Sequence, residues 1–241
     1  MGANSDISWT NDTWNPWQGC KKISEECRYC YMHHLKHKWG QRPDRVSRSR
    51  PQTFNLPLTT FKGPLVFVCS WSDFFIPDAD AWRPEAWDII RQCPHLIFQL
   101  LTKRPHLIPT RLPWDWGQGY PNVWLGVSVG MNKYAHRIPE LLQIPARLYF
   151  LNASPLLENL YIDLSGIDWL ITSGESGPKD KFRPANLNHF RHLRDTCRRF
   201  NVPFFLYQLG GNHKINGVYG GHFLDLTLHK DMPPLHTTGA L

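Results

Sequence analysis

The sequence lacks the features that mark membrane and secreted proteins. No apolar run approaches the roughly 18 residues that a membrane-spanning helix needs. The N-terminus lacks the basic-then-apolar pattern of a signal peptide, and the chain has no internal repeat and no low-complexity segment. A single cytoplasmic domain is therefore expected. In that compartment cysteines stay reduced, and clustered cysteines bind metals more often than they form disulfides.

Acidic residues are scarce relative to basic ones. The 241 residues include 20 Asp and Glu against 27 Lys and Arg, a net charge of +7, with twelve further His. This balance favours an anionic partner, nucleic acid first. Tryptophan is abundant by contrast, with eleven residues. Its large apolar body suits thick cores and the walls of clefts that bind flat ligands.

Three of the six cysteines lie close together, at the spacing C-x6-C-x2-C. The two-residue gap between Cys27 and Cys30 lets two thiolates point at one metal, and Cys20 joins them across a short polar loop. No fourth cysteine is near, although a closed structural site usually has four ligands. An iron–sulfur cube held by three cysteines would leave one iron free to bind a small molecule. A Cys3His zinc site completed by His33 or His34 is the alternative. The other cysteines lie far apart and are expected to be small buried side chains: Cys69, Cys93 and Cys197.

A basic segment follows the cysteines. Residues 36–50 contain six basic residues and one acidic residue, and Gly and Pro interrupt any regular element. The segment is either a solvated loop or a phosphate-contacting strip near the site, with Trp39 inside it. The candidates for nucleic-acid contacts are Arg42, Arg45, Arg48 and Arg50. A second stripe could also follow phosphates, although a solvated helix face is the simpler interpretation: Arg191, Arg194 and Arg198.

Apolar runs alternate with helical patterns from residue 64 onward. Six runs are expected to be buried strands, at residues 65–69, 95–101, 123–127, 147–151, 168–172 and 203–207. Helices are expected at residues 84–93, 134–142 and 186–200, and another beginning at 31–38. Continuous apolar runs that alternate with helices indicate a parallel sheet covered on both faces.

The pattern predicts an α/β fold, a full or partial (β/α) TIM-like barrel with the cysteine loop near the N-terminus. An open doubly wound sheet is the alternative. Residues 7–9 are a candidate edge strand. One domain is expected over residues 1–241, with its core at about 7–210 and a C-terminal extension, 211–241, that wraps the outside.

Small, polar or charged residues follow each predicted strand. In parallel α/β folds the reacting groups collect beyond the carboxyl ends of the strands. An adenosine-containing cofactor needs carboxylates for ribose hydroxyls or an ammonium, which Asp73 and Glu175 would supply. Gly174 and Gly177 would let the backbone approach a ligand closely. Each group could instead serve a turn or a helix cap. The candidate cofactor contacts are Ser70, Ser72, Asp73, Thr102, Lys103, Ser128, Asn152, Gly174, Glu175 and Gln208.

The cysteine stretch and these strand ends together resemble a known family, the phage and bacterial three-cysteine proteins of unassigned function that are related to radical S-adenosylmethionine enzymes. A looser likeness is to the spore photoproduct lyases, which act on DNA. The resembling segments are residues 7–10, 13–16, 19–20, 27–31, 72–73, 101–105, 122–128, 174–177 and 202–205.

The resemblance implies a partial barrel that holds a [4Fe–4S] cluster through Cys20, Cys27 and Cys30. S-adenosylmethionine would chelate the fourth iron, and one electron from a separate donor would cleave it to methionine and a 5′-deoxyadenosyl radical. That radical would abstract hydrogen from the substrate, expected to be nucleic acid or a nucleotide in a bacterial or phage-infected cell. Tyr29 would lie near the adenine.

The chain departs from these relatives at three positions. Gly130 and Ser154 stand where relatives tend to carry acidic residues, and Tyr207 where they carry Lys. The site for the substrate is therefore expected to differ, or the activity to be lost. Two alternatives to a radical enzyme follow. One is a zinc-stabilised nucleic-acid-binding module without catalysis, and the other is an inactive barrel that binds a protein partner.

Overall fold

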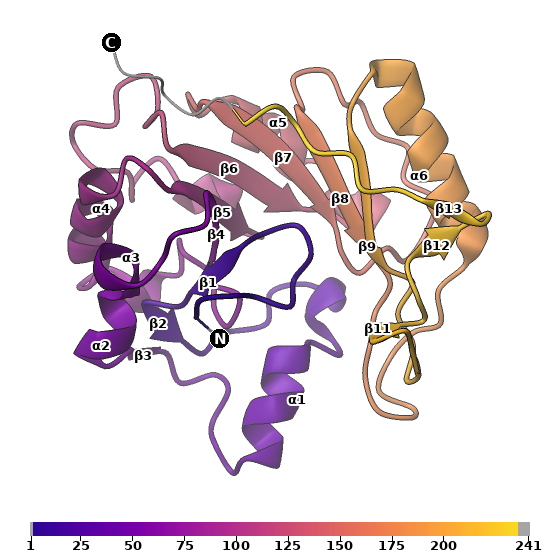
Figure 1. Ribbon diagram of the computed structural model, residues 1–241, viewed down its shortest axis with the longest axis horizontal. Coiled ribbons are helices and arrows are strands. Elements are labelled where there is room, and N and C mark those ends of the chain that lie inside the picture. The colour runs from indigo at the N-terminus through magenta and orange to yellow at the C-terminus, as the bar shows by residue number, and fades with distance from the viewer. Residues whose placement is uncertain (1, 236–241) are drawn as a thin grey trace.

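The computed structural model describes residues 2–235 and centres on one parallel sheet (Figure 1). The order of its strands is their order along the chain. They are β1 (Asp12–Trp14), β4 (Leu65–Val68), β5 (Ile97–Thr102), β6 (Val123–Ser128), β7 (Leu148–Ala153), β8 (Trp169–Ser173) and β9 (Phe204–Gln208). A doubly wound sheet would reverse its strand order at a switch point, so that alternative is wrong. The sheet curls into a half-barrel, which agrees with the partial (β/α) barrel.

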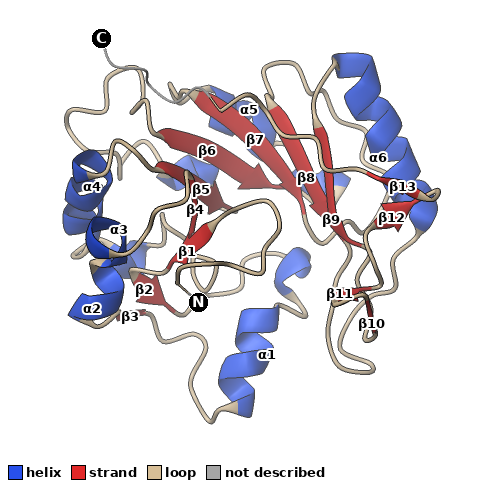
Figure 2. Cartoon of the chain, in the orientation of Figure 1, coloured by secondary structure: helices blue, strands red, loops and turns tan. Residues whose placement is uncertain are grey.

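Helices cover the convex face of this half-barrel (Figure 2). The crossovers contain α4 (Arg83–Gln92), α5 (Arg137–Leu142) and α6 (Leu187–Phe200). Helix α1 (Tyr31–Lys38) instead lies at the carboxyl end of the sheet (Figure 1). The remaining short elements are α2 (Pro51–Phe54), α3 (Leu56–Thr59), η1 (Glu25–Cys27), η2 (Pro77–Ala79), η3 (Pro105–Leu107), η4 (Asn132–Tyr134), and the paired β2 (Trp17–Gln18) and β3 (Ser47–Arg48).

The two faces of the sheet bury two separate apolar clusters, because successive strand residues point to opposite faces. On the convex face, Val66 and Leu100 share one cluster with Trp87, Phe190 and Leu193 from the helices. On the concave face, the second cluster is rich in aromatic rings: Trp9, Phe67, Trp124, Phe150, Trp169 and Phe205. The concave face is thus largely an apolar floor, in which Gln99 of β5 is a buried polar side chain that donates to the Trp9 carbonyl oxygen.

Both ends of the described chain close the side between β1 and β9, which do not pair with each other within residues 2–235. The ring of Trp9 lies 4.5 Å from that of Phe67. Lys230 Nζ donates to the carbonyl oxygen of Leu206 at 2.7 Å and to Ser8 Oγ at 3.2 Å. Trp169 Nε1 donates to the Asp231 carbonyl oxygen at 2.9 Å. The N-terminal turn and the C-terminal segment therefore join the two edges of the sheet, and we call this contact region, residues 7–10 and 229–232, the seam.

Two expectations at the chain ends were wrong. Residues 7–9 form a turn, in which the Thr10 N–H donates to the Ile7 carbonyl oxygen, and the edge strand β1 begins at Asp12. The C-terminal extension forms two hairpins and then runs antiparallel along β9, so it completes the seam instead of wrapping the outside. The hairpins are β10 (Lys214–Ile215) with β11 (Val218–Tyr219) and β12 (Phe223–Leu224) with β13 (Thr227–Leu228). Residues 236–241 of the extension lie outside the described part.

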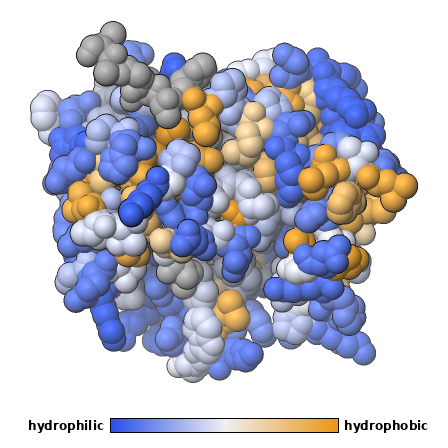
Figure 3. Space-filling view, in the orientation of Figure 1, coloured by the Kyte–Doolittle hydropathy of each residue, from blue (hydrophilic) through white to orange (hydrophobic). Residues whose placement is uncertain are grey.

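The remaining elements follow the sequence pattern closely. Helix α1 has the predicted bounds, and the six predicted strands are all present within a few residues. None of the helices between residues 2 and 235 has the length and apolarity to cross a membrane. The face shown in Figure 3 is largely hydrophilic, with exposed apolar side chains on the β12–β13 hairpin: Phe223, Leu226 and Leu228.

Candidate metal centre at the mouth of the half-barrel

The loop that carries the cysteines is held against the carboxyl ends of the strands. The Gly19 N–H donates to the Trp71 carbonyl oxygen at 3.0 Å, and Ser72 Oγ donates to that of Gly19 at 2.6 Å. Gly19 has φ of +98°, and a Cβ there would lie 2.2 Å from the Arg45 carbonyl oxygen, so this contact requires glycine. The cysteine loop is thus hydrogen-bonded to the residues that directly follow β4.

Cys20 lies beside the guanidinium of Arg104, whose Nη1 and Nη2 are 3.9 and 4.0 Å from its Sγ. Burial, and next the negative charge of Asp73, raise the pKa of Cys20 to about 12, against the opposing effect of Arg104. The thiol is therefore protonated at neutral pH in the metal-free chain. Binding a metal must displace that proton.

The other two thiols have different surroundings. Burial opposes ionisation of Cys27, but the charge of Lys103 and a contact with Ser24 Oγ at 3.5 Å leave its pKa below the ordinary value. Cys30 is the N-cap of α1; burial raises its pKa, while backbone groups of Met32 and His33 oppose the shift. Of the three thiols, Cys27 is therefore the one most easily ionised.

The three thiols are near enough to influence one another's charge, since Cys30 raises the pKa of Cys20 and Cys27 that of Cys30. Yet no three His, Cys, Asp or Glu side chains within residues 2–235 converge as a single metal ion requires. The zinc alternative needs such convergence. Burial, followed by the charge of Lys22, lowers the pKa of the His33 imidazole.

Asp73 is buried and fully engaged by its own chain. Its carboxylate accepts hydrogen bonds from Thr102 Oγ1 at 2.8 and 2.9 Å, from the Phe75 and Lys103 N–H groups, and from Arg104 Nη1 at 2.9 Å. Asp73 and Thr102 thus position Arg104 against Cys20. We did not predict this role for Arg104, although it follows Lys103 at the end of a predicted strand. Contact of Asp73 or Thr102 with a cofactor stays a prediction.

Glu175 also has a partner that the sequence did not reveal. Its Oε1 and Oε2 lie 2.6 and 2.9 Å from Nη2 and Nε of Arg183. The same guanidinium donates to the Glu25 carbonyl oxygen at 3.1 Å and lies 5.7 Å from the centre of the Tyr29 ring. Glu175 therefore fastens the loop after β8 to the cysteine loop, and Tyr29 lies at that junction.

A buried ion pair fixes the other side of the cysteine loop. Glu26 Oε2 lies 2.6 Å from Arg137 Nη1, and both side chains are at most 5% exposed. Glu26 Oε1 accepts from the Gly130 N–H at 2.6 Å. A Cβ on Gly130 would lie 1.9 Å from the Pro155 carbonyl oxygen. Glu26 thus joins the cysteine loop to the turn after β6, where position 130 has no room for a side chain.

The family comparison covers nearly all of this framework. Residues 4–233 match the family model described as "Protein of unknown function (DUF5131)". The chain belongs to the DUF5131 family. No curated protein and no solved structure matches it. The match includes all three cysteines of the loop and every strand of the half-barrel, and the function of this DUF5131 protein must be argued from its site.

Of the remaining predicted contacts of the DUF5131 site, some side chains already have hydrogen-bond partners within the chain and others do not. Ser70 Oγ contacts the Asn15 side chain, and Gln208 Nε2 donates to the Gly174 carbonyl oxygen at 3.4 Å. Asn152 is 6% exposed, and its Oδ1 accepts no hydrogen bond from the described part of the chain. Buried amide oxygens are nearly always paired, so Asn152 points to a missing donor. Two further groups lie at the same mouth, buried Ser128 and half-buried Lys103.

The charge of this DUF5131 chain is concentrated beside the cysteines. Residues 21–50 contain nine Lys and Arg against three Asp and Glu, a net +6 of the whole chain's +7. Arg42 pairs with Asp44, and Arg48 pairs with Glu85 and lies over the Phe54 ring. Two of the four predicted phosphate contacts are thus paired within the chain. Arg45 and Arg50 are exposed, and neither forms an ion pair with a described carboxylate.

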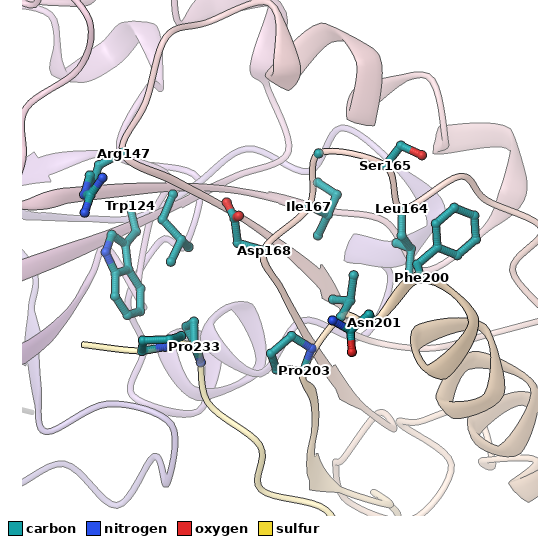
Figure 4. Close-up of a pocket in the computed structure, with 14 residues that line it drawn as sticks. Trp124, Arg147, Leu164, Ser165, Ile167, Asp168, Phe200, Asn201, Pro203 and Pro233 are labelled. Atoms are coloured by element: carbon teal, nitrogen blue, oxygen red, sulfur yellow. The ribbon is translucent and has the colours of Figure 1, made fainter. Parts of the chain in front are cut away.

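One cavity lies away from this site, at the amino ends of β7, β8 and β9 (Figure 4). Arg147, Asp168 and Pro203, which precede these strands, are among its lining residues, together with Trp124 and Pro233. None of the cysteines or predicted cofactor contacts lines it. In parallel α/β folds the opposite edge carries the chemistry, so we assign the candidate site to the cysteine end.

Proposed function

We propose that this DUF5131 protein is a radical S-adenosylmethionine enzyme that modifies or repairs nucleic acid or a nucleotide. It would hold a [4Fe–4S] cluster through Cys20, Cys27 and Cys30. One observation carries the proposal: three free thiols of one loop lie at the carboxyl end of a parallel half-barrel, beside the cations of Lys103 and Arg104.

The donor chemistry of the loop fits the cluster. Three thiolates add negative charge, and the chain offers compensating charge at each: Arg104 at Cys20, Lys103 at Cys27, and the backbone at the start of α1 at Cys30. Each thiolate of a cluster binds its own iron, so convergence of the three on one point is not required. Three cysteines also leave the fourth iron for another ligand.

When bound, the cluster and S-adenosylmethionine would supply reductive cleavage of the sulfonium and abstraction of hydrogen from the substrate. The chain's own residues would bind and orient. The ammonium of Lys103, which forms no ion pair with a described carboxylate, suits the carboxylate of the methionine moiety. The orphaned Asn152 Oδ1 suits a ribose hydroxyl or an amino group. The aromatic floor of the concave face would keep water away from below.

The charge of residues 21–50 supports a nucleic-acid or nucleotide substrate. A separate protein or small molecule must donate the electron, since no other cofactor is proposed. The departures at Gly130, Ser154 and Tyr207 favour a second candidate, an inactive barrel that binds a protein partner. Only the release of 5′-deoxyadenosine separates it from the enzyme.

The test is to purify the protein without oxygen, reconstitute it, and measure iron, sulfide and zinc. We expect about four irons per chain, as one cubane cluster contains. Tight zinc without iron would instead indicate the zinc-stabilised module. S-adenosylmethionine and a strong reductant are then added. Release of 5′-deoxyadenosine supports the enzyme, and an intact cluster that never releases it supports the inactive barrel.

A further inference from the structure

Three aromatic side chains contact one another in a row beside the cysteine loop, and we call this row the aromatic stack: Tyr31, Trp71 and Trp39. The rings of Trp39 and Trp71 are parallel, with centroids 5.4 Å apart and an interplanar angle of 5°. The ring of Tyr31 meets Trp71 edge to face at 6.4 Å. Tyr31 directly follows Cys30, so the stack joins the proposed cluster site to the end of α1.

The inner member of the stack is fixed and the outer member is open. Trp71 is 6% exposed, its backbone N–H donates to Asn15 Oδ1, and its carbonyl oxygen accepts from the Gly19 N–H. Trp39 is 53% exposed although one face of its ring lies against Trp71. Its backbone N–H is held by carbonyl oxygens at the end of α1. The Trp39 ring is thus packed on one face against Trp71 and remains half exposed to solvent.

The chain segment that carries the open ring is basic. Trp39 lies inside the segment of residues 21–50 that carries a net charge of +6. Lys38 precedes it in the sequence, and Arg45 and Arg50 follow it in the same exposed segment. Proteins that bind single strands combine an exposed aromatic ring with cations that have no carboxylate partner, and this segment contains both. The base stacks on the ring and the phosphates meet the cations.

We infer that Trp39 is a stacking platform for an unpaired base of single-stranded nucleic acid, and that this strand approaches the cysteine site along residues 38–50. The inference rests on the proposed function and names its substrate class. A duplex keeps its bases stacked on one another, so a base can reach Trp39 only from a single strand or an opened one.

The test measures the anisotropy of labelled DNA and RNA strands of about 12 nucleotides, with the duplex as comparison, on the reconstituted full chain. We expect single strands to bind more tightly than the duplex. Trp39→Ala should weaken single-strand binding about tenfold, the loss typical of one stacked base, while Trp39→Phe keeps most of the affinity. Trp114→Ala is the matched control, because Trp114 is 93% exposed and lies outside the basic segment. Iron content and thermal unfolding check that each variant is folded.

Unchanged affinity in Trp39→Ala would overturn the inference, as would an equal loss in Trp114→Ala. So would equal binding of the duplex, or of a polyglutamate chain, since either shows attraction to charge without stacking. The proposed function fails separately. If the protein takes up no cluster but binding still depends on Trp39, the platform stands without the radical enzyme. If 5′-deoxyadenosine is released but Trp39 is irrelevant to binding, only the platform fails.

Discussion

Two surfaces of this molecule are rich in arginine, and they differ in where the countercharges lie. On α6, Arg191 and Arg194 both pair with Asp225, and Arg194 and Arg198 pair with Asp195. Residues 21–50 contain nine Lys and Arg but only three Asp and Glu. Two of these arginines, Arg45 and Arg50, form no ion pair with a described carboxylate. A row of arginines is therefore available to a ligand only where the fold brings no carboxylate against it.

The cysteines follow the same division. Cys197 is on the buried side of α6, where burial raises its pKa to about 12, and it packs within the convex apolar cluster. Cys20, Cys27 and Cys30 are only partly buried and lie beside cations. On α6 the cysteine is thus enclosed by apolar side chains, and the arginines are already paired with carboxylates of the chain. The region around the cysteine loop presents the same residue types to whatever occupies the mouth of the half-barrel.

The largest predicted effect separates the two sets of cysteines. Cys27→Ala should abolish cluster uptake, because two thiolates do not retain a cube against competing ligands. Cys197→Ala should leave the iron content unchanged, because Cys197 is enclosed by apolar side chains. Iron and sulfide analysis after anaerobic reconstitution measures both. Equal iron content in the two variants would refute the ligand assignment.

The second prediction contrasts a buried ion pair with an exposed one. Glu26→Gln should lower the free energy of unfolding by about 3 kcal/mol, because it leaves the buried Arg137 guanidinium without a countercharge. Arg191→Ala removes a solvent-exposed pair, and its effect on thermal unfolding should lie within experimental error. Denaturation followed by circular dichroism compares the two. Similar losses would mean that the Glu26 pair is hydrated and does not hold the cysteine loop.

The third prediction concerns the two surfaces as ligands for phosphate. Arg45→Ala should weaken binding of a single-stranded oligonucleotide and reduce the slope of log Kd against log salt by about 1, the change expected for one lost phosphate contact. Arg191→Ala should change neither quantity, since Asp225 already neutralises that side chain. Anisotropy titrations at several salt concentrations give both values. A loss at Arg191 equal to that at Arg45 would reverse the assignment of the surfaces.

The smallest predicted effect is a pH dependence on α6. Hydrogen bonds from Arg191 and then Arg194 lower the pKa of Asp225 to about 2. A carboxylate with a lowered pKa stabilises the fold fully above its unfolded pKa, about 3.9, and loses that effect as pH falls through its folded pKa. The difference in Tm between the native chain and Asp225→Asn should thus be constant above about pH 5 and shrink towards pH 2. A difference that grows on acidification would contradict the pairing.

The sheet was largely readable from the sequence, and its polar contacts were not. Runs such as residues 123–127 are apolar throughout because both faces of the strand are covered, and such runs predict parallel strands. Strand β1 was missed because its three residues include Asp12 and Thr13, whereas the apolar 7–9 run belongs to a turn. Short strands at a sheet edge have little pattern to recognise.

The candidate site was predictable in its position but not in its internal pairing. Parallel strands bring their carboxyl ends to one edge, so the strand-end residues had to meet. Which of them pair depends on residues far apart in sequence: Arg104 reaches Cys20 across 84 residues, and Arg137 reaches Glu26 across 111. No spacing rule connects positions so distant. The ion pairs of Asp73 with Arg104 and of Glu175 with Arg183 were therefore not predicted, and a cofactor contact at either carboxylate stays a prediction.

The match between strand order and chain order has a consequence for synthesis on the ribosome. Each strand can pair with its predecessor soon after it is made, so the sheet can grow from β1 towards β9. The thiols are translated early, but Arg183, which ties their loop to the far side of the half-barrel, comes 158 residues after its partner Glu25. Lys230, which donates a hydrogen bond to Ser8, is translated 222 residues after it. In a nascent chain the three cysteines are therefore exposed well before the residues that enclose them are made. A cluster inserted during translation would enter a site that still lacks Arg183 and the C-terminal segment.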